Sequence, residues 1–230
     1  MGKDKLKRFR EIDAYSHVLQ PSFEEAYRND HKLKGRWAKD FFQNNNPLVL
    51  ELGCGRGEYT VALAKKFPGK NFIGIDIKGA RIWRGAKDSK EENLKNVAFL
   101  RTRIETITSF FGTGEVEEIW ITFPDPQIKQ RRAKKRLTGP WFLNMYKTFL
   151  GEPGIVHLKT DSSELYDYTR RVILKNKLTI LKSIPDLYEK PAGDEILEIR
   201  TYYEKMFLDK GKKIAYLAFR LRGADEICDP

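Results

Sequence analysis

Short apolar runs alternate with longer stretches of helical periodicity through most of the chain. The apolar runs predict strands at residues 47–52, 71–77, 96–100, 117–123, 154–160, 178–184 and 213–221. The periodic stretches predict helices at residues 57–67, 80–94, 139–150 and 162–176. Strands separated by helices favour an α/β fold with a mostly parallel seven-stranded sheet, covered by helices on both faces. The last run is expected to return as an antiparallel edge strand near the C-terminus.

Residues 1–46 do not follow this alternation. They are rich in charge and are expected to be partly helical, mainly from Phe23 onward. They end in three asparagines, which Pro47 follows. We expect them to form a basic extension packed on or beside a single domain at residues 47–230. A chain of 230 residues is long enough for one substantial core, and no segment has the composition of a flexible linker.

The charge balance points to a polyanionic partner. Lys and Arg number 43 against 32 Asp and Glu, a net charge of +11, which exceeds what solubility alone requires. Nucleic acid is the leading interpretation, and an anionic membrane surface is the alternative. No apolar stretch approaches the length of a membrane span, and the start has no secretory signal, so we expect a cytoplasmic protein. Its two cysteines, Cys54 and Cys228, are then expected to be reduced.

A glycine-rich turn follows the first predicted strand of the domain and precedes a predicted helix. Its glycines are Gly53, Gly55 and Gly57. They allow the backbone to approach a ligand, and the helix start offers free N–H groups. A dinucleotide site needs a further glycine where Glu58 stands, so that pattern fails. Asp76, at the end of the next strand, could accept both ribose hydroxyls of a nucleoside. Taken alone, the glycines could form a plain turn and Asp76 could cap a helix. The glycine turn and Asp76 together favour a site for a nucleoside cofactor.

The fourth predicted strand of the domain ends in the sequence FPDP. Pro124 and Pro126 cannot donate ladder hydrogen bonds, so the strand must end by Phe123. The prolines also hold Asp125 in an extended conformation. Ligands of open parallel sheets bind beyond the carboxyl ends of the strands, so Asp125 is a candidate substrate contact. The alternative is an aspartate that caps its own turn.

Residues 129–136, KQRRAKKR, carry six positive charges and no acid. Such a run suits contacts to RNA phosphates, although it could also be a solvated face. The candidates for phosphate contacts are Arg131, Arg132, Lys134, Lys135 and Arg136.

The stretch FPDPQIKQRRAKKRL is similar to the hallmark loop of the bacterial tRNA (guanine-N7-)-methyltransferases. The resemblance extends from about residue 46 to residue 221, through ELGCGRGEY, FIGIDIKGAR, HLKTD and TYYE. The glycine turn after Glu51 also resembles the first motif of class I S-adenosylmethionine-dependent methyltransferases. This resemblance implies a Rossmann-like fold and methyl transfer from S-adenosyl-L-methionine to N7 of a guanine in the tRNA variable loop. The products would be 7-methylguanosine and S-adenosyl-L-homocysteine.

The resemblance also implies roles for individual residues. The implied cofactor contacts are Glu51, Gly53, Gly55, Gly57, Asp76, Arg103 and Asp125, and Asp125 is also the candidate catalytic residue. The implied substrate contacts are Lys129, Asp161, Thr201 and Glu204. The chain departs from the family pattern at four positions. At one of them Asp76 replaces the commoner Glu and keeps the carboxylate. Gln127 replaces a frequent Trp, Arg132 replaces the usual His, and Arg103 replaces an Asn or Asp that touches the adenine.

Several alternatives remain open at this level. Thr201 and Glu204 also match a capping box at a helix start. Trp120, Phe123, Trp141 and Phe142 are mostly core candidates, and the sequence does not show which of them could stack on a base. The rival functions are a methyltransferase for another RNA or a protein, and a non-catalytic RNA-binding protein. We expect tRNA as the partner of a monomer or homodimer, with no metal, membrane or obligate protein partner.

Overall fold

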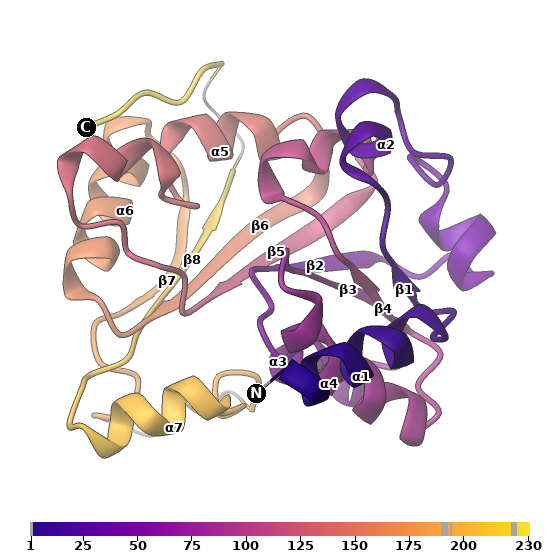
Figure 1. Ribbon diagram of the computed structural model, residues 1–230. Helices are drawn as coiled ribbons and strands as arrows, with labels where there is room; N and C mark the ends of the chain where they lie inside the picture. The colour runs from indigo at the N-terminus through magenta and orange to yellow at the C-terminus, as the bar shows by residue number, and fades with distance from the viewer. Residues whose placement is uncertain (1, 190–192, 194, 222–224) are drawn as a thin grey trace. The chain divides into compact units, whose positions relative to one another are not determined.

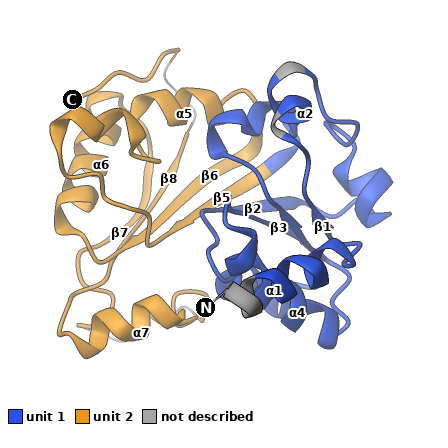
Figure 2. Ribbon diagram, viewed as in Figure 1, with its two compact units in different colours: residues 1–116 blue, residues 117–230 orange. Residues whose placement is uncertain are grey.

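The protein is described here by a computed structural model that covers residues 2–189, 193, 195–221 and 225–230. The chain forms two compact units, unit 1 at residues 1–116 and unit 2 at residues 117–230 (Figure 2).

Unit 1 contains the first four strands and the helices that cover them (Figure 1). Its elements are α1 (Gly2–Asp13), β1 (Val18–Leu19), α2 (Phe23–Arg28), the π-helical turn η1 (Trp37–Phe42), β2 (Leu48–Leu52), α3 (Glu58–Lys66), β3 (Asn71–Ile75), α4 (Gly79–Glu91), β4 (Val97–Leu100) and the 3₁₀ helix η2 (Ile104–Ser109). The strands lie in the order β1-β4-β3-β2 and all pair in parallel. Helices α1, α3 and α4 lie on one side of these strands and α2 on the other (Figure 1).

The apolar runs form strands because both faces of this sheet are covered. Every residue of β2, β3 and β4 is buried, as expected for parallel strands between helical layers. The first 46 residues contribute to the same core. Trp37 is fully buried, and its indole donates to the carbonyl oxygen of Phe110 at 2.8 Å. The Glu115 carboxylate accepts from the backbone N–H groups of Gly35 and Trp37.

Unit 2 contains the strands and helices of the second half of the chain. Its elements are β5 (Val116–Thr122), the 3₁₀ helix η3 (Gln130–Lys135), α5 (Pro140–Tyr146), β6 (Leu150–Thr160), α6 (Ser163–Lys175), β7 (Ile180–Ile184), α7 (Tyr202–Asp209) and β8 (Ala215–Arg220). The strands lie in the order β5-β6-β8-β7, and β8 is antiparallel to both of its neighbours. Helix α6 packs on β6 and β8.

The predicted α/β architecture is confirmed, with three differences in detail. All seven predicted strands form, but the described residues contain eight, because the two-residue β1 also pairs with β4. The antiparallel return near the C-terminus is present as β8, which lies one place inside the edge formed by β7. Helix α1 was not predicted. No helix of the described chain is long and apolar enough to cross a membrane. A boundary between an extension and a domain at residue 46 stays a prediction.

Candidate functional site

The glycine turn of unit 1 has the backbone that only glycine adopts readily. The φ angles of Gly53, Gly55 and Gly57 are 75°, 55° and 71°, all in the left-handed region. A Cβ on Gly57 would lie 2.5 Å from a ring carbon of Phe99, so packing also requires that glycine. A Cβ on Gly53 would meet nothing within 4 Å, which leaves the surface of the turn open to a ligand.

Asp76 holds this turn in place. Strands β2 and β3 end together, and the N–H groups of Gly53 and Cys54 both donate to the carbonyl oxygen of Ile75, at 2.8 and 2.9 Å. One carboxylate oxygen of Asp76 accepts from the Gly55 N–H at 3.0 Å, and the other accepts from the Lys78 N–H at 2.7 Å. The carboxylate is therefore fixed at the carboxyl edge of the sheet, beside the glycines.

Glu51 lies beneath the turn, at the end of β2. Its side chain is 3 % exposed, and its Oε2 accepts from the Thr60 N–H at 2.9 Å and from the Thr60 hydroxyl. These donors compensate a buried carboxylate and tie β2 to α3. Burial, together with Glu51 and Asp76, raises the pKa of the Cys54 thiol well above its usual value. Cys54 is therefore a neutral thiol in the core of the turn.

The residues of unit 1 fit a nucleoside-bearing methyl donor. The open left-handed turn and the Asp76 carboxylate both lie at the edge where β2 and β3 end. Arg103 follows β4, which pairs in parallel with β3, and is therefore at the same edge. Its side chain is exposed. The predicted cofactor residues of unit 1 are thus brought together by strand ends.

The loop after β5 presents Asp125 on a constrained backbone. The Phe123 N–H donates to the carbonyl oxygen of Lys159 at 2.8 Å, so β5 and β6 end at the same edge. Phe123 and Gln127 have φ angles of 50° and 48°, which are uncommon for residues other than glycine. Between them Asp125 is exposed, and its Oδ1 accepts from the Gln127 N–H at 3.1 Å. The self-capping turn is therefore formed, and it orients the carboxylate.

Helix η3 follows this loop and carries most of the predicted phosphate contacts. Arg131, Arg132, Lys134 and Lys135 are exposed, as is Lys129 just before the helix. Arg136 is placed differently. Its Nε donates to the Gln127 carbonyl oxygen at 3.3 Å, and its guanidinium lies 4.1 Å from the centre of the Tyr168 ring. Arg136 therefore braces the loop from inside.

The remaining predicted substrate residues follow β6 and begin α7. Asp161 lies just after β6 and pairs with Lys212 at 2.5 Å. Thr201 caps α7, because its hydroxyl accepts from the Glu204 N–H at 3.2 Å. The capping interpretation is thus correct for Thr201, whereas the Glu204 carboxylate has other partners.

Glu204 lies in a buried polar cluster that sequence reasoning missed. Glu204 and Lys159 are both 0 % exposed, and their charged groups lie 2.8 Å apart. The Tyr188 hydroxyl donates to Glu204 at 2.7 Å, and Lys159 also donates to the carbonyl oxygens of Leu197 and Ile199. Burial lowers the pKa of Lys159, while Glu204 opposes that shift. Lys159 belongs to the HLKTD stretch. Its sequence context does not reveal that it pairs with Glu204, because the two residues are far apart in the chain.

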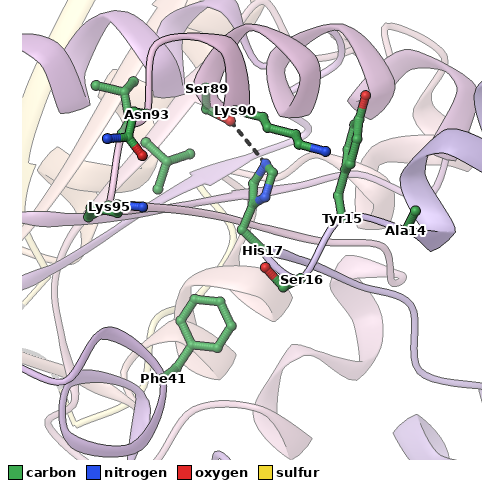
Figure 3. Close-up of a pocket in the computed structure, with 11 residues that line it drawn as sticks. Ala14, Tyr15, Ser16, His17, Phe41, Ser89, Lys90, Asn93 and Lys95 are labelled. Carbon is green, nitrogen blue, oxygen red and sulfur yellow. Dashed lines mark hydrogen bonds between the residues drawn. The ribbon is translucent and has the colours of Figure 1, made fainter.

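Unit 1 also contains a polar cavity of about 590 Å³ away from the glycine turn (Figure 3). Tyr15, His17, Lys90 and Lys95 line it (Figure 3). Val97, the first residue of β4, also lines it, so the cavity lies near the start of the parallel strands, opposite the ends that carry the glycine turn. The His17 ring donates to the carbonyl oxygen of Ala86 at 3.0 Å, and burial lowers its pKa. Its lining residues come from separate segments of the chain, so no sequence motif predicts the cavity. Within the described chain, no group of three or more His, Cys, Asp or Glu side chains could hold a metal ion.

Comparison with known proteins defines the class and then the family. Residues 45–217 match the family described as "Putative methyltransferase". The fold is similar to that of the 30S ribosomal A1408 methyltransferase from an uncultured bacterium, with a TM-score of 0.55 and 20 % identity over 79 % of this chain and 90 % of that one. The fold is thus that of a class I methyltransferase.

Two relatives named tRNA (guanine-N(7)-)-methyltransferase are far more similar in sequence. The protein from Christiangramia forsetii is 53 % identical over 96 % of this chain and 99 % of its own length. The protein from Bacteroides fragilis is 50 % identical over 100 % of this chain and 90 % of its own length. The chain belongs to the tRNA (guanine-N7-)-methyltransferase family.

Proposed function

We propose that this protein transfers a methyl group from S-adenosyl-L-methionine to N7 of a guanine in the variable loop of tRNA. The products are 7-methylguanosine in the RNA and S-adenosyl-L-homocysteine. The structural observation that carries this proposal is the loop after β5. In this member of the family, that loop presents Asp125 at a strand end, directly before a helix with four exposed cations.

The donor would be held by residues of unit 1. The glycine turn offers backbone N–H groups and open space, and Asp76 offers carboxylate oxygens for ribose hydroxyls. Glu51 supports the turn from beneath, and Arg103 at the same edge is the candidate for the adenine side. When bound there, S-adenosyl-L-methionine supplies an electrophilic methyl group on a sulfonium.

The acceptor chemistry places modest demands on the protein. Guanine N7 has an in-plane lone pair at neutral pH, so the N7–carbon bond forms as the sulfur–carbon bond breaks, and no proton is released. The protein must chiefly align the reactants and exclude water. Positive charge develops on the imidazole ring of the base, where a nearby carboxylate stabilises it. Asp125 is the proposed carboxylate, and Asp161 is a candidate acceptor for the N1–H and amino group of the guanine.

RNA binding is assigned to the exposed cations around η3. Arg131, Arg132, Lys134 and Lys135 would contact phosphates together with Lys129, and these contacts position the RNA without reading its sequence. Thr201 remains a proposed substrate contact beside its capping role. Glu204 is proposed to act on the substrate only through the elements that its buried cluster holds. We further propose action in the cytoplasm as a monomer or homodimer without an obligate protein partner.

The proposal is tested by methylation of bulk tRNA from a strain that lacks the enzyme, followed by nucleoside mass spectrometry. We expect 7-methylguanosine at one position of the variable loop. Methylation of ribosomal RNA or protein, with tRNA unmodified, would instead assign another substrate. Donor binding without transfer to any of these would indicate a non-catalytic RNA-binding protein.

A further inference from the structure

Trp141 is a large aromatic side chain on the surface of unit 2. It is 52 % exposed, whereas Trp120 and Phe142 are 3 % exposed and belong to the core. Phe142 contacts the indole edge-on, with the two rings at 79° and their centres 4.6 Å apart. Phe123 is half-buried and packs against Phe207. Of the four aromatic residues that the sequence left undecided, Trp141 is therefore the most exposed.

A small cavity lies beside this indole. Its volume is about 270 Å³, and its lining comes from the end of η3, the start of α5, α6 and the C-terminal segment. The lining residues are Ala133, Lys134, Gly139, Pro140, Trp141, Tyr168 and Asp229. The Tyr168 hydroxyl donates to the Asp229 carboxylate at 2.6 Å, which places a hydrogen-bond acceptor on an otherwise mainly apolar wall.

The wall formed by the C-terminal segment is firmly held. The Asn144 amide donates to the Ile227 carbonyl oxygen and accepts from the Ile227 N–H, at 2.8 and 2.9 Å. The Asn176 amide makes the same reciprocal pair with Cys228, both at 2.8 Å. Asp229 follows directly, so its position beside the cavity is set by four hydrogen bonds to the preceding backbone.

The charge around the cavity favours one kind of occupant. Lys134 lines the cavity and also belongs to η3, where Arg131, Arg132 and Lys135 are exposed. A flat aromatic surface beside a row of cations is the arrangement with which proteins hold an unpaired nucleotide, the base on the ring and the phosphates on the cations. The cavity of unit 1 that contains Tyr15 is less suited, because the Tyr15 ring already stacks on His17 and lies under Lys90.

We infer that the Trp141 cavity binds one unpaired nucleobase of the tRNA, other than the methylated guanine, and thereby fixes the RNA against η3. This inference rests on the proposed function, because it names a second contact of the same substrate. The base stacks on the indole, its neighbouring phosphates lie along η3, and Asp229 accepts a hydrogen bond from a base that carries an N–H donor.

The first test compares Trp141→Ala and Trp141→Phe with the wild type. Base stacking on an aromatic ring contributes about 1–3 kcal/mol, so Trp141→Ala should weaken tRNA affinity about 5- to 150-fold. The phenylalanine variant should retain most of the affinity. We expect KM for tRNA to rise with kcat and donor affinity unchanged. Binding to a fully paired RNA duplex should not change in either variant.

The second test locates the base. tRNA transcripts with a single abasic site at each unpaired position are titrated against the wild type and Trp141→Ala. At one position the abasic site should weaken wild-type binding yet add nothing to the loss in Trp141→Ala, which is the coupling expected of partners in contact. Bound tRNA should also quench the indole fluorescence of the wild type and of Trp83→Phe, but much less that of Trp141→Phe.

Three results are decisive against the inference. If the wild type methylates tRNA and Trp141→Ala has wild-type affinity and KM, the inference fails and the proposed function stands. If Trp141→Ala dissociates a dimer in sedimentation without loss of tRNA affinity, the cavity is a protein interface and the inference is wrong. If the wild type neither binds nor methylates tRNA, the proposed function fails and the inference fails with it.

Discussion

Glu51, Asp76 and Glu204 are assigned to ligands by family resemblance, yet each carboxylate already holds protein groups. Glu51 binds Thr60, Asp76 binds the backbone of the glycine turn, and Glu204 binds Lys159. A substitution at any of them therefore changes the shape of the site as well as its chemistry. Asp125 differs, because it is exposed and its carboxylate accepts a hydrogen bond from the nearby Gln127 N–H.

Asp125→Asn should lower methyl transfer by about two to three orders of magnitude, the usual cost of removing one preorganised electrostatic group. An asparagine oxygen still accepts from the Gln127 N–H, so the turn should persist. Transfer of radiolabelled methyl groups to unmodified tRNA measures the loss, and calorimetry should show that most of the donor affinity is kept, because the other donor contacts remain. Wild-type turnover by this variant would remove Asp125 from the mechanism.

Lys159→Met should destabilise unit 2 by about 3–5 kcal/mol, because it leaves the buried Glu204 carboxylate without its counter-ion. The double variant Lys159→Met, Glu204→Met removes both charges and should recover part of that stability. Urea unfolding of the two variants measures the difference. If the double variant is also fully active on tRNA, Glu204 is not a substrate contact.

His17 should make the stability of unit 1 depend on pH. Its pKa is lowered from 6.5 in the fold by burial, so below about pH 6.5 the unfolded chain binds a proton that the folded protein excludes. The free energy of unfolding should therefore fall as the pH falls from 7.5 to 5.5. His17→Gln keeps a donor for the Ala86 carbonyl and should show a shallower decrease in urea unfolding. Equal decreases in the wild type and His17→Gln would contradict this assignment.

Among the elements, the strands between helices were predictable because burial on both faces leaves an uninterrupted apolar run. The elements that were not predicted depend on contacts between distant segments, which the local hydrophobic pattern does not indicate. Strand β1 has two residues and is defined by its pairing with β4. Helix α1 packs on α4, where Trp83 meets the Arg8 guanidinium and donates a hydrogen bond to Glu11. Strand β6 begins at Leu150, four residues before the predicted strand at residues 154–160, and therefore includes Pro153.

Helix η3 should set much of the salt dependence of RNA binding. Replacing Arg132 and Lys135 by Gln should reduce the slope of log K against log salt by about 1.4–1.8, since each neutralised phosphate contributes about 0.7–0.9. Fluorescence titration of labelled tRNA over a range of salt concentrations measures this slope. The matched control replaces Lys175 and Lys177, two exposed lysines at the end of α6, and should leave the slope nearly unchanged. Equal slopes in both variants would mean that η3 is only solvated.

For the whole molecule, some features of the candidate site could be predicted from the sequence, and others are visible only in the structure. The sequence could predict that the proposed donor residues of unit 1 lie together, because parallel strands end at one edge of the sheet. The loop after β5 could be predicted because prolines and charges are visible locally. The Lys159 cluster and the Trp141 cavity could not, since β6 and α7 meet in the first, and η3, α5, α6 and the C-terminal segment in the second.

The net charge of +11 should act on one ligand and not on the other. Binding of tRNA should weaken steeply as salt rises, because counterions are released from its phosphates. Donor affinity, which depends on hydrogen bonds at the glycine turn, should change less than about twofold over the same range. Calorimetry measures donor affinity and titration measures tRNA affinity, both at salt concentrations from about 50 to 300 mM. A parallel decline of both affinities would contradict this separation.

The two cysteines differ in a way that provides an experimental handle. Cys54 is buried in the glycine turn with a raised pKa, whereas Cys228 is exposed on a backbone that Asn176 holds in place. A maleimide dye should therefore couple selectively to Cys228 in the native protein, with no engineered mutation. The dye would then stand one residue from Asp229, where its emission reports directly on whatever enters the neighbouring cavity.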